Sequence, residues 1–444
     1  MRQITSWIGL ALAAAALPAA GDDLLQVYRD AQRYDAVFSA ARFTLDAGRE
    51  RLTQGRALLL PTLDLNASTT RRRDEVEPRD PAIPPFERSA TANIYTFTLK
   101  QPVYRPQNLA TYNQADFQVK QAEATFAQAS QDLAVRVAQA YLDVLAAEDT
   151  LALVGAQKAA ISEQLAQAKR NFEVGTATIT DTHEAQSRYD LIAAQEIAAQ
   201  NDLVNRRQSL QLITGKEYAR LAPLRADVRI PPPDPNQLQP WVDLAEKQSY
   251  VVQIQEAAAE SARLAVKFAG SGHWPTLDLV ARYGLNSQSA VTSTTGGAGV
   301  DTTTGSIGLE LALPLYKGGG ISSSEREAAA NYNKIREDLQ NARRTAALTA
   351  RQSYVSVVNG IAQVSALEQA LISSQSALDS NRLGYEVGVR INIDVLNAQQ
   401  QLFSTRRDLA LARYNTISSH LKLRAAAGTL REEDIEEFNR VLVP

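Results

Sequence analysis

Apolar and polar residues alternate with a period of two in four short segments of the chain. In one of them, Leu277, Leu279 and Ala281 alternate with more polar neighbours. Such a pattern is typical of a strand with one apolar and one polar face, and about ten residues is the length of a tilted strand that crosses a bilayer. The predicted strands cover about residues 62–73, 91–100, 275–286 and 305–313.

The two strands of each pair are separated by a segment that is typical of an exposed loop. Residues 74–90 are charged and rich in proline, and residues 286–305 are rich in serine, threonine and glycine. Pro102 and Pro314 come at the end of each pair, and proline cannot donate a hydrogen bond to a sheet. We therefore expect these two prolines to close the strand pairs and to lead into helices.

One very long helix follows each strand pair, and the two predicted helices cover residues 107–170 and 320–384. The first run contains no proline and one glycine, Gly155, and its apolar seam has a mean period of 3.5, as in a coiled coil. The first seam is Val119, Ala122, Phe126, Ala129, Leu133, Val137, Ala140, Val144, Ala147, Leu151 and Val154. The second seam is Tyr332, Ile335, Leu339, Ala342, Ala346, Ala350, Ser353, Val357, Gly360, Val364 and Leu367.

The two seams are not expected to pack equally well. Ser353 and Gly360 predict weaker packing of the second helix. Small apolar residues that lie off the first seam predict a second contact face, as in a helix with neighbours on both sides; they are Ala127, Ala134, Ala138, Leu145 and Ala152.

Both long helices end at a Val-Gly pair that is expected to form the tip of a helical hairpin. Gly175 and Gly388 allow the left-handed turn that often ends a helix, and polar residues that can cap a following helix come next. The predicted return helices cover residues 181–214 and 394–427. Further helical stretches are expected over residues 23–58 and from Trp241 to Phe268, and the acidic segment 430–444 is expected to be less regular.

The chain contains the same structural unit twice. Pro61-Thr62-Leu63-Asp64-Leu65 returns 214 positions later as Pro275-Thr276-Leu277-Asp278-Leu279, and Phe172-Glu173-Val174-Gly175 returns 213 positions later as Tyr385-Glu386-Val387-Gly388. A duplicated unit of this length is half of the structure rather than a short stacking repeat. The expected organisation is a signal peptide (1–21), a first repeat (22–216), a Pro-rich linker or equatorial segment (217–240), a second repeat (241–430) and an acidic C-terminal tail (431–444).

Composition excludes several classes of function. The 444 residues include no cysteine and three scattered histidines, and the net charge is −3. Without cysteine there are no disulfides, no thiol catalysis and no lipid-modified N-terminal cysteine. The glycine-rich segments lack the Gly-Lys-Ser/Thr sequence of a phosphate loop, and the charge argues against a general nucleic-acid surface. We therefore expect no catalytic, cofactor or metal site.

The N-terminus is typical of an export signal. Arg2 supplies a positive charge, Ile8 to Leu17 is an apolar run, and Pro18-Ala19-Ala20 offers small residues for cleavage. A buried N-terminal helix is the alternative interpretation. No other stretch reaches about 18 uninterrupted apolar residues, so no transmembrane helix is expected.

Four strands per chain are too few to close a membrane sheet. An open sheet edge is not viable in lipid, and single-chain barrels start at about eight strands, which leave little lumen. Two chains would give eight strands, and three would give twelve, enough for a water-filled bore. We therefore expect a trimer, with helices that close into a tube in the same way.

The duplication, the Pro-Thr-Leu-Asp-Leu strand starts, the long helices rich in alanine and glutamine, and the Val-Gly tips followed by Asp181 and Asp394 resemble the TolC family of outer-membrane efflux and secretion ducts. The resemblance covers about residues 22–430. It implies a mainly α, trimeric fold in which a 12-stranded β-barrel, with four strands from each chain, continues into a long α-helical barrel of coiled-coil hairpins.

The resemblance also implies a location and partners. The expected location is the outer membrane of a Gram-negative bacterium, with the helices extending into the periplasm. The expected partners are two further copies of the chain, a periplasmic adaptor (membrane fusion) protein, an inner-membrane transporter of the ABC or RND type, and outer-membrane lipid. The implied function is a channel-tunnel for type I protein secretion, multidrug efflux or both, and the absence of an N-terminal cysteine mildly favours secretion or a general role.

An exported coiled-coil scaffold, or a periplasmic adaptor without a membrane pore, is the alternative function. A lipoyl-type adaptor would have a β-domain split around one hairpin, rather than two matched strand pairs. Solubility without detergent would favour the scaffold.

The resemblance places the periplasmic entrance of the duct at the tip around residues 385–397, with tip turns at Gly175 and Gly388. Tyr385 and Arg390 match the residues that latch the closed aperture, and Asp181 matches their partner on the neighbouring hairpin.

Asp394 matches the carboxylate that faces the bore, so that a trimer would carry a ring of three such groups. Converging carboxylates favour cations. The best-known members of the family have a second aspartate one turn later, where this chain has Asn397, and we therefore expect weaker cation binding.

These residues also have plainer interpretations. Asp181 and Asp394 are equally suited to complement the dipole at a helix N-terminus, and Tyr385 and Arg390 are then ordinary exposed helix residues. His183, beside Asp181, is interpreted as a surface residue of the first helical turn rather than as a pH sensor.

Overall fold

The computed structural model describes residues 21–225, 228–289 and 298–443. Its helices are α1 (Leu24–Tyr34), α2 (Ala36–Ala57), α3 (Pro106–Glu173), α4 (Ile179–Thr214), α5 (Leu238–Gln248), α6 (Tyr250–Gly270), α7 (Gly320–Glu386), α8 (Asn392–Ala426) and α9 (Glu432–Asn439). Its strands are β1 (Thr62–Val76), β2 (Phe86–Tyr104), β3 (Thr276–Gln288) and β4 (Val300–Ala312). The predicted export signal lies outside the described residues except for Gly21, and so do residues 290–297 of the expected loop.

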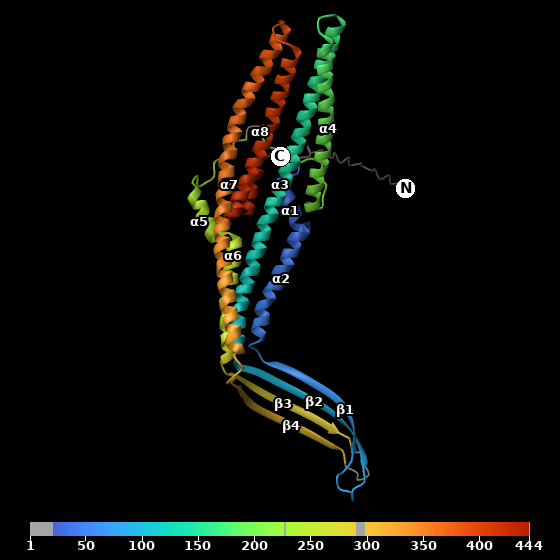
Figure 1. The fold of residues 1–444 in the computed structure, drawn as a ribbon, viewed down its shortest axis with the longest axis vertical. Coiled ribbons are helices and arrows are strands. Elements are labelled where there is room, and N and C mark those ends of the chain that lie inside the picture. Colours follow the sequence, from blue (N-terminus) through green and yellow to red (C-terminus); the bar gives the residue numbers. More distant parts are fainter. Residues whose placement is uncertain (1–20, 226–227, 290–297, 444) are drawn as a thin grey trace, which may run out of the picture. The chain divides into compact units, whose positions relative to one another are not determined.

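The chain forms two compact units, each built from parts of both repeats. The helical unit comprises Met1–Arg42, Ala127–Ser249 and Arg343–Pro444, and the sheet unit comprises Phe43–Phe126 and Tyr250–Ala342. In the helical unit, α3 with α4 and α7 with α8 form two antiparallel hairpins (Figure 1). The mainly helical fold with a single antiparallel sheet agrees with the predicted fold class.

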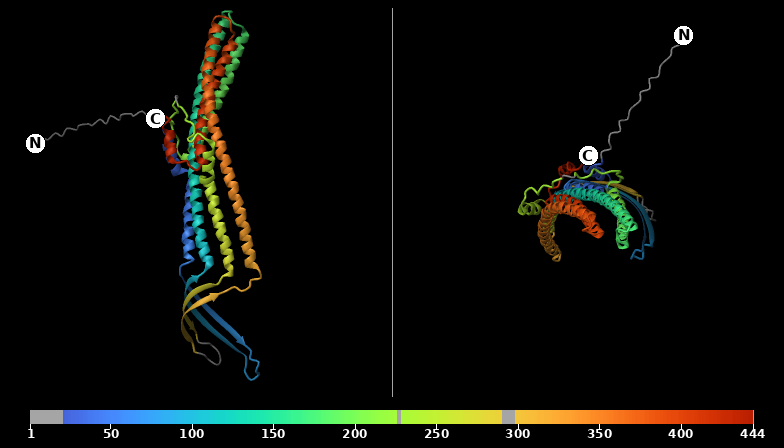
Figure 2. Two further views of the ribbon diagram at one scale, coloured as in Figure 1. Left: turned by 90° about the vertical axis from the view of Figure 1, so that its left-hand side faces the viewer. Right: turned by 90° about the horizontal axis from the view of Figure 1, so that it is seen from above.

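The sheet has the strand order β1-β2-β3-β4, and every neighbouring pair is antiparallel (Figure 1). Figure 2 shows the same strands from two further sides. Thr62 lies opposite Lys100 in the first hairpin, and Thr276 lies opposite Ala312 in the second. Thr276 follows Thr62 by 214 positions and Ala312 follows Lys100 by 212. The two β-hairpins therefore have the same register.

All four predicted strands are present, and they are longer than the alternation indicated. β2 begins at Phe86 and β4 at Val300, so both extend into segments that were expected to be loops. Pro102 does not end β2, which continues to Tyr104 with a register shift between these two residues. Such an irregularity accommodates a residue without an N–H, and because the β1–β2 pairing itself ends at Lys100, Pro102 closes that strand pair as expected.

α3 and α7 are uninterrupted helices of 68 and 67 residues. Every position of the two predicted seams is buried or half-buried. Ala134, Ala138 and Leu145 are buried as well, which confirms a second contact face on this part of α3, whereas Ala152 is exposed.

Gly360 does not weaken the second seam as expected. A Cβ at this position would lie 2.5 Å from Oγ1 of Thr416, which is buried on α8. Val357 and Val364 on either side of the glycine are also buried. The glycine therefore permits a close approach of α7 and α8, because a larger side chain would collide with Thr416.

Two stretches that were expected to be continuous helices are each broken. The break between α1 and α2 lies at Asp35, and that between α5 and α6 lies at Ser249. The Asp35 carboxylate accepts a hydrogen bond from the N–H of Phe38 (2.7 Å) and pairs with Arg136 of α3 (3.1 Å). Burial alone would raise the pKa of Asp35, but the Arg136 guanidinium and backbone N–H groups outweigh it and hold the pKa below its ordinary value.

The C-terminal segment is more regular than the sequence indicated. It contains α9, whose Ile435 is buried in the main core of the helical unit. Oδ1 of Asn439 accepts a hydrogen bond from the N–H of Leu24 (3.0 Å), and its Nδ2 donates to Asp23 (2.8 Å). The last described helix is thus held against the first.

α7 contains a stretch that is long and apolar enough to cross a membrane by length and composition alone. The expectation of no transmembrane helix rested on uninterrupted apolar runs, which is a stricter criterion. Only 11% of this stretch is buried within the chain. Some apolar residues of α7, such as Val357 and Val364, are buried in the chain's core, whereas others, such as Val355 and Ile372, are exposed.

Candidate functional site

The two hairpin tips turn in the same way. At the end of α3 the N–H of Thr176 donates to the carbonyl of Asn171 (2.8 Å), and the N–H of Gly175 donates to that of Phe172 (3.0 Å). The second tip repeats both bonds 213 positions later. The φ angles of Gly175 and Gly388 are 74° and 77°, and such a paired arrangement ends many helices at a glycine. Both predicted tip turns are therefore present.

The first tip is closed by a reciprocal cap. The Thr178 hydroxyl accepts a hydrogen bond from the N–H of Asp181 (3.3 Å), while the Asp181 carboxylate accepts one from the N–H of Thr178 (2.9 Å). The Thr178 hydroxyl also donates to the same carboxylate oxygen, Oδ2 (2.8 Å). Asp181 thus has the capping role that its plainer interpretation proposed.

The second tip lacks such a cap. Ile391 occupies the capping position of α8 and makes no side-chain hydrogen bond to the helix. Asp394 lies in the first turn, where its carboxylate is 3.6 Å from Nη1 of Arg390, and both side chains are partly exposed. An exposed ion pair of this length contributes little stability. The start of α8 therefore lacks the side-chain cap of α4, but its first turn is more buried, with Asn392, Val395 and Leu396 each at most 3% exposed.

Arg390 also explains the glycine at position 384. A Cβ on Gly384 would lie 2.7 Å from Cγ of Arg390, so the aliphatic part of Arg390 packs directly over this position. The carbonyl of Gly384 accepts hydrogen bonds from the N–H groups of Val389 and Arg390. The backbone thus fixes where the Arg390 side chain starts, while its guanidinium stays exposed.

The two hairpins meet near their tips around a small apolar cluster. Its buried members are Leu165, Ala168, Ala185 and Leu396, which come from α3, α4 and α8. Polar side chains surround it. Nε2 of Gln164 donates to Oδ1 of Asn392 (2.8 Å), and Nδ2 of Asn171 donates to the hydroxyl of Tyr385 (3.2 Å).

A further polar contact joins α4 to α8. Arg188 donates one hydrogen bond to Oδ1 of Asn397 (2.9 Å) and one to Oε1 of Gln400 (2.5 Å). Asn392 is 2% exposed, and its Nδ2 has no hydrogen-bond partner among the described residues. The hairpins are thus joined here by a buried apolar cluster and by polar contacts, of which those of the charged Arg188 are the stronger.

The predicted site residues are thus brought together only in part. Arg390 and Asp394 are neighbours, and Tyr385 binds the other hairpin through Asn171. No hydrogen bond or ion pair among the described residues joins Asp181 to Tyr385 or Arg390. His183 is exposed, as its surface interpretation requires.

Sequence reasoning missed three contacts. Asn171 and Arg188 were not singled out, and Asn392 was expected only to cap the return helix, because a polar residue on a long helix looks the same whether it faces water or a neighbouring hairpin. The repeat offset carried one usable signal: position 171 holds asparagine where its counterpart, 384, holds glycine. The described residues contain no group of His, Cys, Asp and Glu that could hold a metal ion.

The chain matches the model of the family described as "Outer membrane efflux protein" over residues 27–216 and 241–429. It is 34% identical over 420 residues to the outer membrane protein TolC of Vibrio cholerae serotype O1, which covers 94% of this chain and 93% of that relative. It is 32% identical over 419 residues to the proteases secretion protein PrtF of Dickeya chrysanthemi, which covers 94% and 90%.

The fold is similar to that of the Campylobacter jejuni CmeC outer membrane channel, with a TM-score of 0.78 and 16% identity over 95% of this chain and 90% of that one. The family model spans both repeats and the relatives match nearly the whole chain. The chain therefore belongs to the outer membrane efflux protein family.

Proposed function

We propose that three copies of this chain form an outer-membrane channel for type I secretion and efflux. Each copy contributes four strands to a shared barrel in the outer membrane, and the helical hairpins of the three copies enclose the bore on the periplasmic side. The channel receives its cargo from an inner-membrane transporter through a periplasmic adaptor protein. Relatives that are named for protease secretion and for efflux support both uses.

One observation carries this proposal: the described sheet has two edges that remain unpaired within the chain. β1 and β4 each pair with one strand only, and both expose large apolar residues. These residues are Leu63, Leu65, Ile307, Leu309 and Leu311. A sheet of this kind in lipid must close against other strands, because its edge N–H and C=O groups find no water there.

The helical unit has a similar need for neighbours. Helices α4 and α7 both expose large apolar side chains, which are Leu191, Ile197, Val204 and Leu212 on α4 and Leu348, Val355, Val358 and Ile372 on α7. Contiguous exposed apolar residues mark interaction surfaces. Packing of α4 from one copy against α7 from the next would cover both sets.

The hairpin tips form the gated entrance of this channel. Three Asp394 carboxylates line the constriction, and Asn397 adds no charge to this ring. The Arg390 of the same copy lies beside each carboxylate and partly offsets its negative charge. Arg390, Tyr385 and Asp181 latch the closed state. The second carboxylate oxygen of Asp181 supports its role in the latch. The N–H and the hydroxyl of Thr178 both donate to Oδ2, so the cap leaves Oδ1 available for a partner.

The decisive experiment measures mass and conductance of the purified protein. Extraction that requires detergent, a complex of three chains, and ion conductance in planar bilayers would support the channel. A soluble single chain without conductance would replace it by the exported scaffold.

Replacing Arg390 by Ser tests the latch in the same bilayers. We expect the conductance of the closed state to rise about twofold, because a group that holds the constriction is lost. Arg382→Ser, which changes an exposed arginine of α7, is the matched control. Equal conductance of the two variants would remove Arg390 from the latch.

A further inference from the structure

A cluster of three charged residues around one buried carboxylate joins the two repeats within the sheet unit. Asp278 of β3 is 4% exposed, and its carboxylate accepts a hydrogen bond from Nε of Arg105 (2.7 Å) and a second one from Nη2. Lys100 of β2 completes the cluster at 3.1 Å. Because β2 belongs to the first repeat and β3 to the second, this cluster fastens one repeat to the next.

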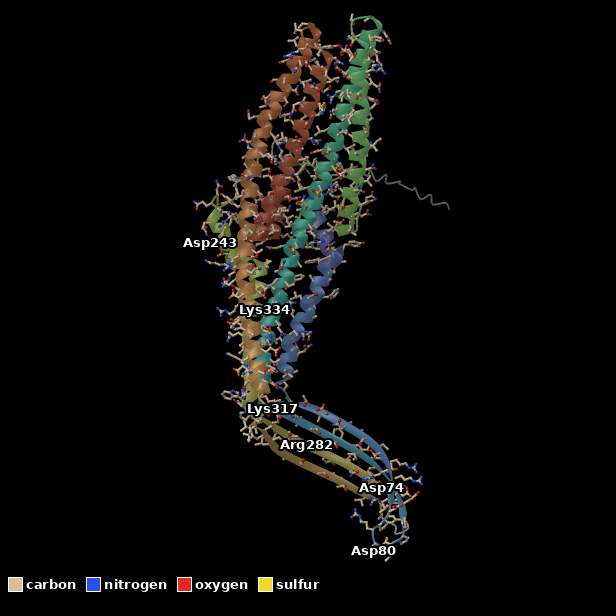
Figure 3. All side chains as sticks on the ribbon, in the orientation of Figure 1. Asp74, Asp80, Asp243, Arg282, Lys317 and Lys334 are labelled. Atoms are coloured by element: carbon tan, nitrogen blue, oxygen red, sulfur yellow. The ribbon has the colours of Figure 1, made fainter. Side chains whose placement is uncertain are left out.

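The repeat contains the same two partners a second time, at the opposite edges of the sheet. Asp64 corresponds to Asp278 in the Pro-Thr-Leu-Asp-Leu sequence, and Lys317 corresponds to Arg105 after the Pro-x-Tyr sequence. Both Asp64 and Lys317 are exposed, and neither forms an ion pair with a described residue. Figure 3 shows Lys317 where β4 leads into α7, at the end of the sheet away from Asp74.

The backbone supports this equivalence. The carbonyl of Arg105 accepts a hydrogen bond from the N–H of Asn108 (3.0 Å), and that of Lys317 accepts one from the N–H of Gly320 (3.0 Å). The cross-strand neighbour of Asp278 on β4 is Glu310, and that of Asp64 on β2 is Thr98, which is the counterpart of position 310. Asp64 therefore has the same backbone environment as Asp278, but no described strand lies on its other side to supply a basic partner.

We propose that Lys317 of one copy binds Asp64 of the next copy and thereby sets the register in which β4 pairs with β1. This proposal rests on the proposed assembly of several copies. Within the chain, Pro102 lies opposite Asp278 and Lys100 lies opposite Val280. The equivalent positions in β4 lie 212 residues after those in β2, and the equivalent positions in β1 lie 214 residues before those in β3. The same pairing between copies would therefore place Pro314 opposite Asp64 and Ala312 opposite Asn66 of the neighbouring copy.

A charge pair is well suited to this task. A slip by one residue would turn every side chain of an edge strand to the other face, and a slip by two would separate the two charges. Exposed apolar residues along β1 and β4 cannot by themselves distinguish registers that differ by two, because the alternation repeats every two residues. The ion pair distinguishes them.

We expect the Asp64–Lys317 pair between copies to be weaker than the Asp278 cluster within the chain. Lys100 corresponds to Ala312, so the second cation is missing. Lys317 also precedes Gly318 and Gly319, which have φ angles of 58° and 79°, so α7 begins two equivalent positions later than α3. A lysine on a more adaptable segment replaces the forked arginine.

Cysteine pairs test the register directly, because the chain has no cysteine of its own. Residues directly opposite each other in an antiparallel pair are about 4.5–5.5 Å apart at Cα, which suits a disulfide. We expect the full-length variant Asn66→Cys with Ala312→Cys to form roughly tenfold more disulfide-linked oligomer than Ser68→Cys with Ala312→Cys. Preferred linkage of the second variant would overturn the register.

Charge exchange tests the ion pair. Asp64→Lys alone and Lys317→Asp alone should each lower the temperature at which the oligomer dissociates by several degrees, and the double exchange should recover most of that loss. Arg282→Ala, which breaks an exposed pair with Glu310 inside the sheet, is the control and should leave the dissociation temperature nearly unchanged.

The outcomes separate this proposal from the one on which it rests. A wild-type chain that forms no oligomer would overturn both. An oligomer that ignores both charge changes, or that is not restored by the double exchange, would overturn only the Asp64–Lys317 pair.

Discussion

The two helical hairpins of this chain share a turn and differ in almost everything around it. The α3–α4 tip has a reciprocal cap between Thr178 and Asp181, whereas the α7–α8 tip starts its return helix at Ile391 without one. Duplication has thus preserved the backbone geometry and released the side chains. The same turn therefore tolerates two different starts of the return helix, one capped by side-chain hydrogen bonds and one whose first turn is buried, at Asn392 and Val395.

The interiors of the hairpins differ in the same sense. Lys158 of α3 forms an ion pair with Glu196 of α4 at 2.6 Å. Their counterparts 213 positions later are Leu371 and Leu409, which belong to an apolar cluster between α7 and α8. The first hairpin is joined here by charge and the second by packing, so the two should react differently to salt and pH.

Substitution of the tip glycines should have the largest effect and should be equal in both tips. Gly175→Ala and Gly388→Ala place a Cβ in a left-handed conformation, which costs about 1–2 kcal/mol. Amide hydrogen exchange at the end of α3 or α7 would measure this loss. A much smaller effect in one tip would show that the two turns are not equivalent.

Replacing the two tip aspartates by alanine should separate them. In the trimer, Asp394→Ala removes three converging charges and should weaken the block of channel current by multivalent cations by roughly tenfold. Asp181→Ala is the matched variant: because Asp181 is assigned to the latch and to the cap of α4 rather than to the ring in the bore, its loss should raise the closed-state conductance but leave the sensitivity to multivalent cations unchanged. Unchanged block in Asp394→Ala would exclude this residue from the bore.

The capping difference predicts a smaller, local change. Thr178→Ala should destabilise the first turn of α4 by about 1 kcal/mol and speed its amide exchange about fivefold. Ile391→Ala, at the equivalent position, should change exchange at the start of α8 little, because no cap hydrogen bond is lost. Equal effects would contradict the contrast between the tips.

The smallest effect is expected from the ion pair between α3 and α4. The hydrogen bond with Glu196 raises the pKa of Lys158 in the folded state. The contribution of the ion pair to stability is therefore complete below the ordinary lysine pKa, and it is lost as the pH rises through the higher pKa of the folded state. Above about pH 10.5, protection of α3 and α4 against exchange should fall more in the wild type than in the Lys158→Leu, Glu196→Leu variant. Parallel losses would show that the pair contributes nothing.

Most of the fold could be predicted from periodicity. The expected first return helix, 181–214, corresponds to α4 at Ile179–Thr214, because Gly215 ends it in a left-handed conformation. The breaks at Asp35 and Ser249 were missed, since neither residue is a helix breaker, and Asp35 acts through Phe38 and Arg136. Such a partner from another element leaves no local signal.

The site was less predictable than the fold. The two tip glycines, Gly175 and Gly388, were predicted correctly, because a left-handed turn at the end of a helix favours glycine. The hydrogen-bond partners of Asn171, Arg188 and Asn392 depend on how the two hairpins pack against each other. These partners are more than 200 positions away in the sequence, so no local pattern indicates them. The function of Gly360 was misjudged for the same reason, because the reason for its small size lies on α8, at Thr416.

The contact between α1 and α9 has a consequence for how the protein is made. Asp23 and Leu24 find their hydrogen-bond partner more than 400 positions later, at Asn439. Because a ribosome releases the N-terminus first, these hydrogen bonds cannot form until α9 has been synthesised. Chains cut short before α9 would therefore lack both the Asn439 contacts and the buried Ile435, which leaves the core of the helical unit incomplete.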